Sequence, residues 1–364
     1  MAGCVQSFTD ARYWKMLTRL QTVVITGGSQ GMGRGLGKLL AQKGANVVIV
    51  ARNEQKLADA LKYISVRKPH FAWEKRTALT GYMQSAAKSP QSQRFHSISA
   101  DVTSSSENIR LIQEVTAWND GNPPDVVWAN AGGAHPYLFI DTDLETQRAQ
   151  MDLNYWAAAY LAHATLKLWL RPNAEKQDAA AAKAAKPRHL IMTGSVASFA
   201  PLTGYVPYTG AKAAMRSMAD NLRQEMNLYN GYRRSHPALA PAADVQVHLI
   251  APGTIISPGL DNEESIKHPV TKVLEEGDLK QTEDEVALAA VKGLEAGGFM
   301  IATQLLAKLM RGGMLGGSPR NNVFTDTLWS WLASVVWLFV GPDMEGKVFN
   351  WGKKNKVDLP GADK

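Results

Sequence analysis

The chain has 364 residues, of which 45% are hydrophobic and 20% are charged, and it contains one cysteine, Cys4. This composition is typical of a globular protein in a reducing compartment, and it excludes wholesale disorder, collagen-like or coiled-coil architecture, an intrachain disulfide framework and a cysteine-rich zinc module. The net charge of +7 is mild and suits a solvated surface as well as phosphates or an anionic membrane, and because no basic run has interleaved aromatic residues, we expect no nucleic-acid partner.

Six strand patterns, most of them apolar or β-branched runs, alternate with helix patterns along the chain. In chain order, the strands are predicted at residues 22–26, 46–51, 95–102, 125–129, 189–194 and 244–250. The helices are predicted at residues 31–44 and 53–65, after a cap at Ser104, and at residues 144–171 and 206–228. This alternation predicts an α/β fold with a doubly wound parallel sheet, in one domain that spans residues 1–310.

Three segments stand outside this alternation. Residues 1–20 lack an uninterrupted apolar core, so we expect no signal peptide. Residues 66–94 are polar and without a convincing period, which indicates an inserted loop or a flexible helix. Residues 172–187 form a second insertion, in which the alanine-rich stretch 179–186 favours a helix. Neither insertion requires a second domain.

A glycine-rich turn directly follows the first predicted strand and reads Thr26-Gly27-Gly28-Ser29-Gln30-Gly31-Met32-Gly33. Glycines allow the backbone to approach a pyrophosphate closely, and the free N–H groups and dipole at a helix start favour an anion. Because a strand precedes this turn and a helix follows it, we interpret it as a dinucleotide site. The alternative is a tight turn without a ligand.

The end of the second predicted strand indicates which dinucleotide binds. An acidic residue there would accept hydrogen bonds from a ribose hydroxyl, whereas a basic residue would pair with a 2′-phosphate. The chain has Arg52 at this point, and the nearest acid, Glu54, lies inside the following helix. Arg52, with Ser29 and Lys56, therefore favours NADP(H), although Arg52 also fits an ordinary surface cation at a helix start.

A tyrosine and a lysine one helical turn apart form the candidate catalytic pair. Tyr208 and Lys212 have Y-x-x-x-K spacing in a predicted helix, which places them on one face. A nearby ammonium stabilises phenolate, so we expect Lys212 to lower the pKa of Tyr208 from about 10 towards neutrality and make it a proton donor to a carbonyl oxygen. Taken alone, this spacing also occurs by chance in many helices.

Two further polar residues accompany this pair. Ser195 lies 13 residues before Tyr208, at the carboxyl end of a predicted strand, where ligands bind in open α/β sheets. Its hydroxyl would hold a substrate carbonyl, and the spacing favours it over the nearby Ser198. Asn154 stands in an apolar stretch of the predicted helix 144–171, where it is either a satisfied buried amide or a site residue.

The order and spacing of these motifs resemble the short-chain dehydrogenase/reductase superfamily over about residues 20–300. The resemblance rests on the glycine turn, Asn130-Ala131-Gly132, Asn154, Ser195, Tyr208, Lys212 and Pro252-Gly253. It implies a Rossmann-type fold in which Asp101 and Val102 contact the adenine ring, with a helix-cap role for Asp101 left open. It further implies that Asn130 shapes the nicotinamide side of the cleft and that Pro252, Gly253 and Thr254 lie beside the nicotinamide.

The same resemblance implies the roles of the catalytic residues. Ser195 would orient a ketone, Tyr208 would protonate it, Lys212 would tune Tyr208 and hold the nicotinamide ribose, and Asn154 would hold a water that relays protons to Lys212. Many relatives pair through the helices after the fourth and fifth strands, so a homodimer or tetramer is expected. No His, Asp or Glu cluster has ligand-like spacing, so we expect no metal.

Within the superfamily, the chain looks most like the 3-ketodihydrosphingosine reductases. The similar stretches include residues 130–134, 194–198, 205–212 and 281–287. This likeness implies reduction of 3-oxosphinganine to sphinganine with NADPH. The alternatives are a steroid or other acyl-chain ketoreductase, a non-catalytic NADP(H)-sensing scaffold, and a membrane tether on a reductase-like fold.

The C-terminal part, residues 311–364, holds an apolar segment and a basic tail. Residues 327–340 contain 11 apolar residues in 14, which is short for a spanning helix of about 20 residues. Basic residues on both flanks and tryptophans favour an interfacial or re-entrant segment on a lipid surface, with burial in the core or in a subunit interface as the alternative. Residues 299–310 would close the sheet, lie on the membrane or line a lipid-sized opening. By the family likeness, the expected location is the endoplasmic reticulum membrane, with the catalytic domain facing the cytosol.

Overall fold

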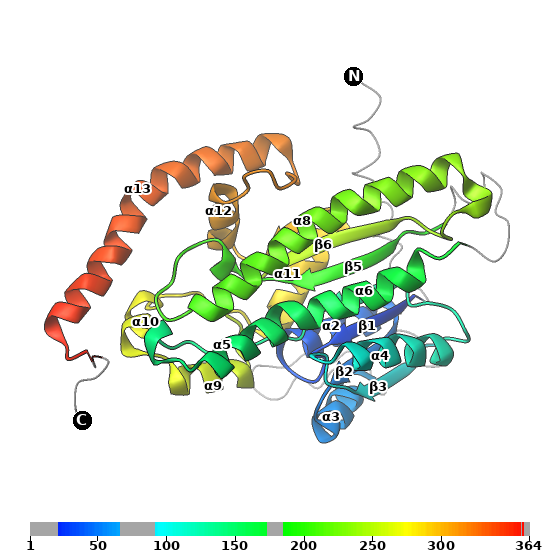
Figure 1. Cartoon of the computed structure of the whole chain (residues 1–364), viewed down its shortest axis with the longest axis horizontal. Helices are drawn as coiled ribbons and strands as arrows, with labels where there is room; N and C mark the ends of the chain where they lie inside the picture. Colours follow the sequence, from blue (N-terminus) through cyan, green and yellow to red (C-terminus); the bar gives the residue numbers. More distant parts are fainter. Residues whose placement is uncertain (1–20, 66–91, 173–184, 358, 360–364) are drawn as a thin grey trace, which may run out of the picture.

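The computed structural model describes residues 21–65, 92–172, 185–357 and 359. Residues 1–20, with Cys4, and nearly all of the two insertions lie outside the described residues, as does most of the helix expected at 179–186. The described chain forms one parallel sheet with helices on both faces (Figure 1). The predicted doubly wound α/β fold is therefore confirmed.

The sheet has seven parallel strands in the order β3-β2-β1-β4-β5-β6-β7. Its strands are β1 (Thr22–Thr26), β2 (Asn46–Ala51), β3 (Phe95–Ser99), β4 (Val126–Ala129), β5 (Arg188–Thr193), β6 (Val245–Ala251) and β7 (Met300–Ala302). The strand order reverses between β1 and β4, which are direct neighbours in the sheet. In such sheets the crevice at this reversal point binds ligands at the carboxyl ends of the strands.

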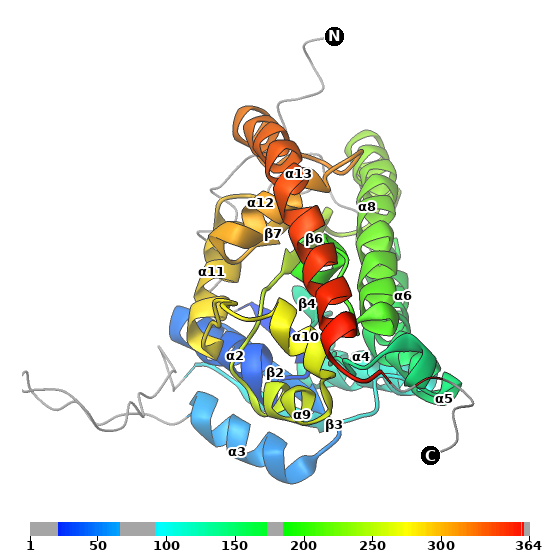
Figure 2. The ribbon, with the colours of Figure 1, turned by 90° about the vertical axis from the view of Figure 1, so that its left-hand side faces the viewer.

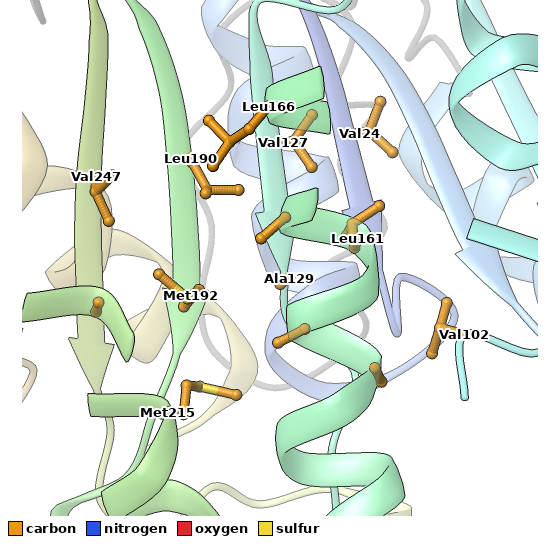
Figure 3. Packing of buried hydrophobic residues seen from close by; sticks show 14 of the residues in the cluster. Val24, Val102, Val127, Ala129, Leu161, Leu166, Leu190, Met192, Met215 and Val247 are labelled. Carbon is orange, nitrogen blue, oxygen red and sulfur yellow. The ribbon is translucent and has the colours of Figure 1, made fainter. Parts of the chain in front are cut away.

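Two hydrophobic layers hold the helices against the sheet. One face carries α2 (Gly31–Lys43), α3 (Glu54–Ser65) and α11 (Glu283–Glu295), and the other carries α4 (Ser105–Trp118), α6 (Ala157–Trp169) and α8 (Val206–Ser235). On the second face, Leu161 and Leu166 of α6 and Met215 of α8 pack with side chains of β4 and β5 (Figure 3). These layers fix the strand ends that carry the candidate site.

Short helices lie in the segments that follow the strands. They are η1 (Phe139–Asp141), α5 (Leu144–Met151), η3 (Val196–Ser198), α9 (Pro258–Ile266), α10 (Pro269–Leu274) and α12 (Leu305–Gly313), while η4 (Pro237–Leu239) follows α8. Ser104 caps α4 by accepting a hydrogen bond from the Glu107 amide, as predicted.

The helix predicted at 144–171 contains a break that the sequence did not indicate. A π-helical turn, η2 (Asp152–Trp156), separates α5 from α6, and Asn154 lies fully buried within it. The predicted helix 206–228 is also longer, because buried Arg233 donates hydrogen bonds to the Pro241 and Ala242 carbonyls and extends α8 to Ser235. Tertiary contacts, rather than local propensity, therefore set the length of α8.

The stretch 299–310 divides between two elements. Met300–Ala302 forms β7, which pairs with β6 and closes the sheet, and α12 begins at Leu305. Of the three possibilities for this stretch, closure of the sheet is therefore confirmed for its first part. Leu306, Leu309 and Met310 of α12 line the large cavity described below.

The apolar segment at 327–340 belongs to a much longer helix, α13 (Val323–Lys354). The helix continues through Gly341-Pro342-Asp343, and Asp326 lies inside its first turn. By length and composition, α13 is the one helix among the described residues that is apolar enough to cross a membrane, with a mean hydropathy of 1.5. Figure 2 shows α13 running from α12 past α10, and the His268 and Trp351 rings lie 5.2 Å apart near its end.

Candidate active site

A cavity of about 690 Å³ opens at the carboxyl ends of the central strands. Most of the predicted site residues line it: Gly27, Ser29, Gln30, Gly31, Arg52, Lys56, Asp101, Val102, Asn130, Ser195, Tyr208, Lys212, Pro252, Gly253 and Thr254. Gly28, Gly33 and Asn154 do not line it. The sheet edge thus brings the separate motifs into one site.

The glycine turn has the backbone that its residues allow. Gly27 and Gly31 have φ values of 66° and 54°, in the left-handed region that favours glycine. A Cβ on Gly33 would lie 2.2 Å from the Gly27 carbonyl oxygen, so the start of α2 packs directly on the turn. The N-cap residue of α2, Gln30, makes no side-chain capping bond, which leaves the first N–H groups of α2 available to an anion at the cavity.

A hydrogen-bond network joins the ends of β1, β4 and β5. The Thr26 hydroxyl accepts hydrogen bonds from the Asn130 and Ala131 amides at 3.0 and 3.1 Å. The Thr193 hydroxyl donates to the Asn130 side-chain oxygen at 3.1 Å. Thr193 was not singled out from the sequence, although its place at the end of a predicted strand was a signal for it.

The catalytic candidates meet at the start of α8. Ser195 follows β5, and its hydroxyl accepts a hydrogen bond from the Ala197 amide at 3.1 Å. Lys212 is buried and donates a hydrogen bond to the Thr193 carbonyl at 2.9 Å, and its Nζ lies 5.6 Å from the centre of the Tyr208 ring. Ser198 does not line the cavity, in agreement with the preference for Ser195.

Burial dominates the ionisation of this group, and the predicted tuning of Tyr208 is wrong for the described side chains. Desolvation raises the pKa of Tyr208 to about 12, although a hydrogen bond with Ser195 acts in the opposite direction. Desolvation also lowers the pKa of Lys212 to about 7. Because desolvation outweighs the favourable interactions of the phenolate, the pKa of Tyr208 stays above its ordinary value, and Tyr208 is a protonated phenol at neutral pH.

Asn154 is a satisfied buried amide that lies next to the candidate catalytic lysine, Lys212. Its side-chain oxygen accepts from the Gly133 amide at 3.1 Å, and its nitrogen donates to the Gly133 carbonyl at 2.9 Å. A Cβ on Gly132 would lie 2.8 Å from that side-chain oxygen and 3.1 Å from Lys212 Nζ. The wide π-helical turn places Asn154 here, and such turns are frequent at functional sites.

The end of the cavity next to β2 is basic. Arg52 and Lys56 line it, and Lys56 Nζ donates a hydrogen bond to the Gln30 side chain at 3.3 Å. Glu54 does not line the cavity. Asp101 accepts hydrogen bonds from the Thr103 amide and hydroxyl, which lower its pKa against the opposing effect of burial, so it holds a turn and does not cap α4.

The end of the cavity that α9, α10 and α13 line was not predicted from the sequence. Charged side chains enter it from α9, α10 and the following loop: Glu263, Lys267, Glu275 and Asp278. One face of α13 adds Ala333, Val336, Trp337, Val340 and Met344, whose spacing of three or four residues places them on one side of the helix. No strand–helix pattern predicts this contact, because it joins segments far apart in the chain.

The part of the chain that the structure describes contains no candidate metal site. No group of three or more His, Cys, Asp or Glu side chains there is placed to hold a metal ion.

Comparison with known proteins relates the chain to one family. The profile of the family described as short chain dehydrogenase matches residues 21–77 and 74–266. Among solved structures, a short chain dehydrogenase/reductase from Burkholderia phymatum in complex with NAD has a TM-score of 0.58 at 15% identity, covering 84% of this chain and 97% of that chain. That similarity concerns the fold.

Two curated fungal proteins are similar over nearly the whole chain. The 3-ketodihydrosphingosine reductase of Aspergillus fumigatus is 48% identical over 338 residues, which cover 93% of this chain and 86% of the relative. The 3-ketodihydrosphingosine reductase of Neurospora crassa is 37% identical over 335 residues, which cover 92% and 83%. Both alignments are long enough to include the cavity and its catalytic candidates.

Proposed function

The chain belongs to the short-chain dehydrogenase/reductase family and is an oxidoreductase, and we propose that it reduces 3-ketodihydrosphingosine (3-oxosphinganine) to sphinganine with NADPH. The observation that carries this proposal is the cavity itself. It combines the glycine turn, the basic end at Arg52 and the group Ser195, Tyr208 and Lys212 with an apolar wall from α12 and α13.

The residues present fit a phosphorylated dinucleotide. The open N–H groups at the start of α2 would hold the pyrophosphate, and Arg52 and Lys56 would pair with a 2′-phosphate. Asp101 and Val102 would border the adenine, while Asn130, Pro252, Gly253 and Thr254 would border the nicotinamide. When bound, the cofactor supplies the hydride that reduces the ketone carbon.

The protein would position the ketone and supply the proton. Ser195 would donate a hydrogen bond to the carbonyl oxygen, and Tyr208, which is protonated at neutral pH, would transfer its phenolic proton to that oxygen. The resulting phenolate would be stabilised by Lys212, whose ammonium would also hold the nicotinamide ribose. Asn154 would keep Lys212 and the neighbouring backbone in place and complete a proton relay.

The long-chain substrate matches the apolar half of the cavity. Leu306, Leu309 and Met310 of α12 line it, as do Val336 and Trp337 of α13. An alkyl chain would bury its surface there at about 25 cal/mol per Å² of area removed from water. A steroid ketone is the alternative occupant, because it is also a large apolar molecule.

An NADPH-oxidation assay on the purified protein tests the proposed function. We expect turnover of 3-ketodihydrosphingosine and much slower turnover of steroid ketones at matched concentrations. Activity confined to steroid ketones would favour the alternative substrate, and NADP(H) binding without reduction of any ketone would favour a sensing scaffold or tether.

We also propose that α13 lies on a lipid surface. Its outer face exposes Phe324, Trp331, Leu338 and Phe339, whereas its inner face lines the cavity, so the helix stays against the catalytic body along its length. This arrangement favours an interfacial helix over a spanning one. By the family likeness, the membrane would be that of the endoplasmic reticulum, with the catalytic body in the reducing cytosol. A homo-oligomer stays a prediction.

A further inference from the structure

One carboxylate enters the cavity beside the catalytic tyrosine. Glu263, on α9, lines the cavity, and its Oε1 accepts a hydrogen bond from the Ala134 amide at 3.4 Å. Ala134 belongs to the segment after β4, so this hydrogen bond links α9 to the carboxyl end of that strand. Its charge contributes to the raised pKa of Tyr208, which places the carboxylate within electrostatic reach of the phenol.

The surroundings of Glu263 leave its charge incompletely balanced. Lys267, whose charge acts on Glu263, is buried and forms ion pairs with Glu264 at 2.9 Å and with Glu275. Among the described residues, no cation lies within 4.0 Å of the Glu263 carboxylate. Burial raises the pKa of Glu263, with opposing effects from the Ala134 amide and Lys267, so a cationic ligand at this point would stabilise the carboxylate.

We propose that Glu263 binds the ammonium group of an α-amino ketone and thereby selects this substrate class. The inference rests on the proposed function. In an α-amino ketone, the nitrogen is attached to the carbon next to the carbonyl, so its binding group must lie a few ångströms from the carbonyl-binding hydroxyls. Glu263 lines the same cavity as Ser195 and Tyr208, and it holds the amide of Ala134, two residues from Gly132, which packs against Lys212.

The Glu263 carboxylate disfavours the binding of uncharged ketones. A steroid or plain acyl ketone would occupy the cavity and exclude water without offering a cation to Glu263. A buried carboxylate without a partner is costly, and sites built around a polar partner reject analogues that lack it. Glu263 therefore separates the two substrate classes that the apolar wall alone does not distinguish.

Paired substrates and matched variants test this role. The substrates are 3-ketodihydrosphingosine and the same hydroxyketone without the amino group. We expect Glu263→Gln to lower kcat/KM for the amino ketone roughly 10- to 100-fold, mainly through KM, and to raise kcat/KM for the deaminated ketone, because the unpaired charge is gone. The control Glu264→Gln, which removes an adjacent carboxylate that does not line the cavity, should preserve the wild-type ratio of the two kcat/KM values.

Several outcomes would overturn the assignment. The assignment fails if Glu263→Gln keeps the wild-type ratio of the two kcat/KM values. It also fails if Asp278→Asn, instead of Glu263→Gln, abolishes the preference for the amino ketone. If Glu263→Gln does not fold, Glu263→Asp and the wild type still decide, because a wild-type enzyme that reduces both ketones equally well has no ammonium site. If the wild type reduces neither ketone, the proposed function itself fails; if it reduces the amino ketone while Glu263→Gln is unaffected, this inference alone fails.

Discussion

Burial sets the chemistry of the individual site residues. Lys212 keeps its Nζ on the Thr193 carbonyl inside the protein, and its pKa of about 7 puts its protonation equilibrium at physiological pH. Tyr208, with a pKa of about 12, holds its proton until a reaction draws it away. The spacing of Tyr208 and Lys212 on one helical turn does not predict these two pKa values, because it leaves out the desolvation of both side chains.

The buried lysine gives the folded protein a pH-dependent stability. Between pH 7 and the ordinary lysine pKa of 10.5, the unfolded chain protonates Lys212 more fully than the folded chain does, so the free energy of unfolding rises with pH. We expect urea unfolding to show that wild type gains roughly 2 kcal/mol over Lys212→Met between pH 7.5 and 9.5. A difference between the two proteins that is the same at both pH values would contradict the lowered pKa.

Arg52 is expected to set the cofactor preference. Arg52→Asp places an anion where a 2′-phosphate would bind and provides an acceptor for a ribose hydroxyl, so the ratio of kcat/KM for NADPH to that for NADH should fall by at least about tenfold. Glu54→Gln, outside the cavity wall, serves as the control and should keep the wild-type ratio. If Arg52→Asp keeps the wild-type ratio of kcat/KM for NADPH to that for NADH, the basic end of the cavity does not bind the 2′-phosphate.

Among the secondary-structure elements, α13 is the one whose placement the site depends on most. Its first turn is fixed by a buried ion pair between Arg311 of α12 and Asp326, and Arg311 also donates a hydrogen bond to the Met300 carbonyl at 2.7 Å. A Cβ on Gly312 would lie 2.8 Å from that of Trp329, so the two helices approach closely. This junction sets the cavity-lining face of α13.

Removal of one member of that ion pair should loosen α13. Asp326→Asn leaves the Arg311 charge buried without its partner, which costs about 3–5 kcal/mol for buried pairs. We expect faster amide hydrogen exchange and proteolysis in α12 and α13, with the sheet strands unaffected. The double variant Arg311→Met/Asp326→Leu removes both charges and should recover most of the protection. Equal exchange in wild type and Asp326→Asn would refute the role of this junction.

At the scale of the whole molecule, α13 combines a cavity wall with an exposed apolar surface. Trp331, Leu338 and Phe339 are 70%, 70% and 72% exposed, on the same helix whose other face lines the cavity. Deletion of the helix would therefore remove both features at once, and point substitutions are needed to separate them. A lipid substrate would have a short path from a membrane surface to the catalytic group.

Outer-face substitutions separate membrane binding from catalysis. We expect Trp331→Ser/Leu338→Ser/Phe339→Ser to reduce cosedimentation with anionic lipid vesicles by more than tenfold, since each large apolar side chain contributes about 1.5–3 kcal/mol when fully buried. Turnover of detergent-dispersed substrate should persist. The control Leu144→Ser/Leu228→Ser changes exposed leucines on α5 and α8. Undiminished vesicle binding by the triple variant would contradict an interfacial α13.

The sequence predicts the cofactor half of the cavity far better than the substrate half. Strand ends carry Gly27, Arg52, Asn130 and Ser195, and a parallel sheet brings such ends to one edge whatever the loops do. Glu263 and the lining face of α13 come from segments joined only by tertiary packing, so no local period indicates their meeting. No local period indicates the π-helical turn at Asn154 either.

The most direct test of the account compares the wild type with Tyr208→Phe in two measurements, NADPH binding by fluorescence and single-turnover reduction of 3-ketodihydrosphingosine. If Tyr208 is the proton donor, we expect Tyr208→Phe to have a dissociation constant for NADPH within about twofold of wild type. Its reduction rate should be lower by at least about 100-fold, because only the proton donor is lost. Reduction by Tyr208→Phe at close to the wild-type rate would contradict it.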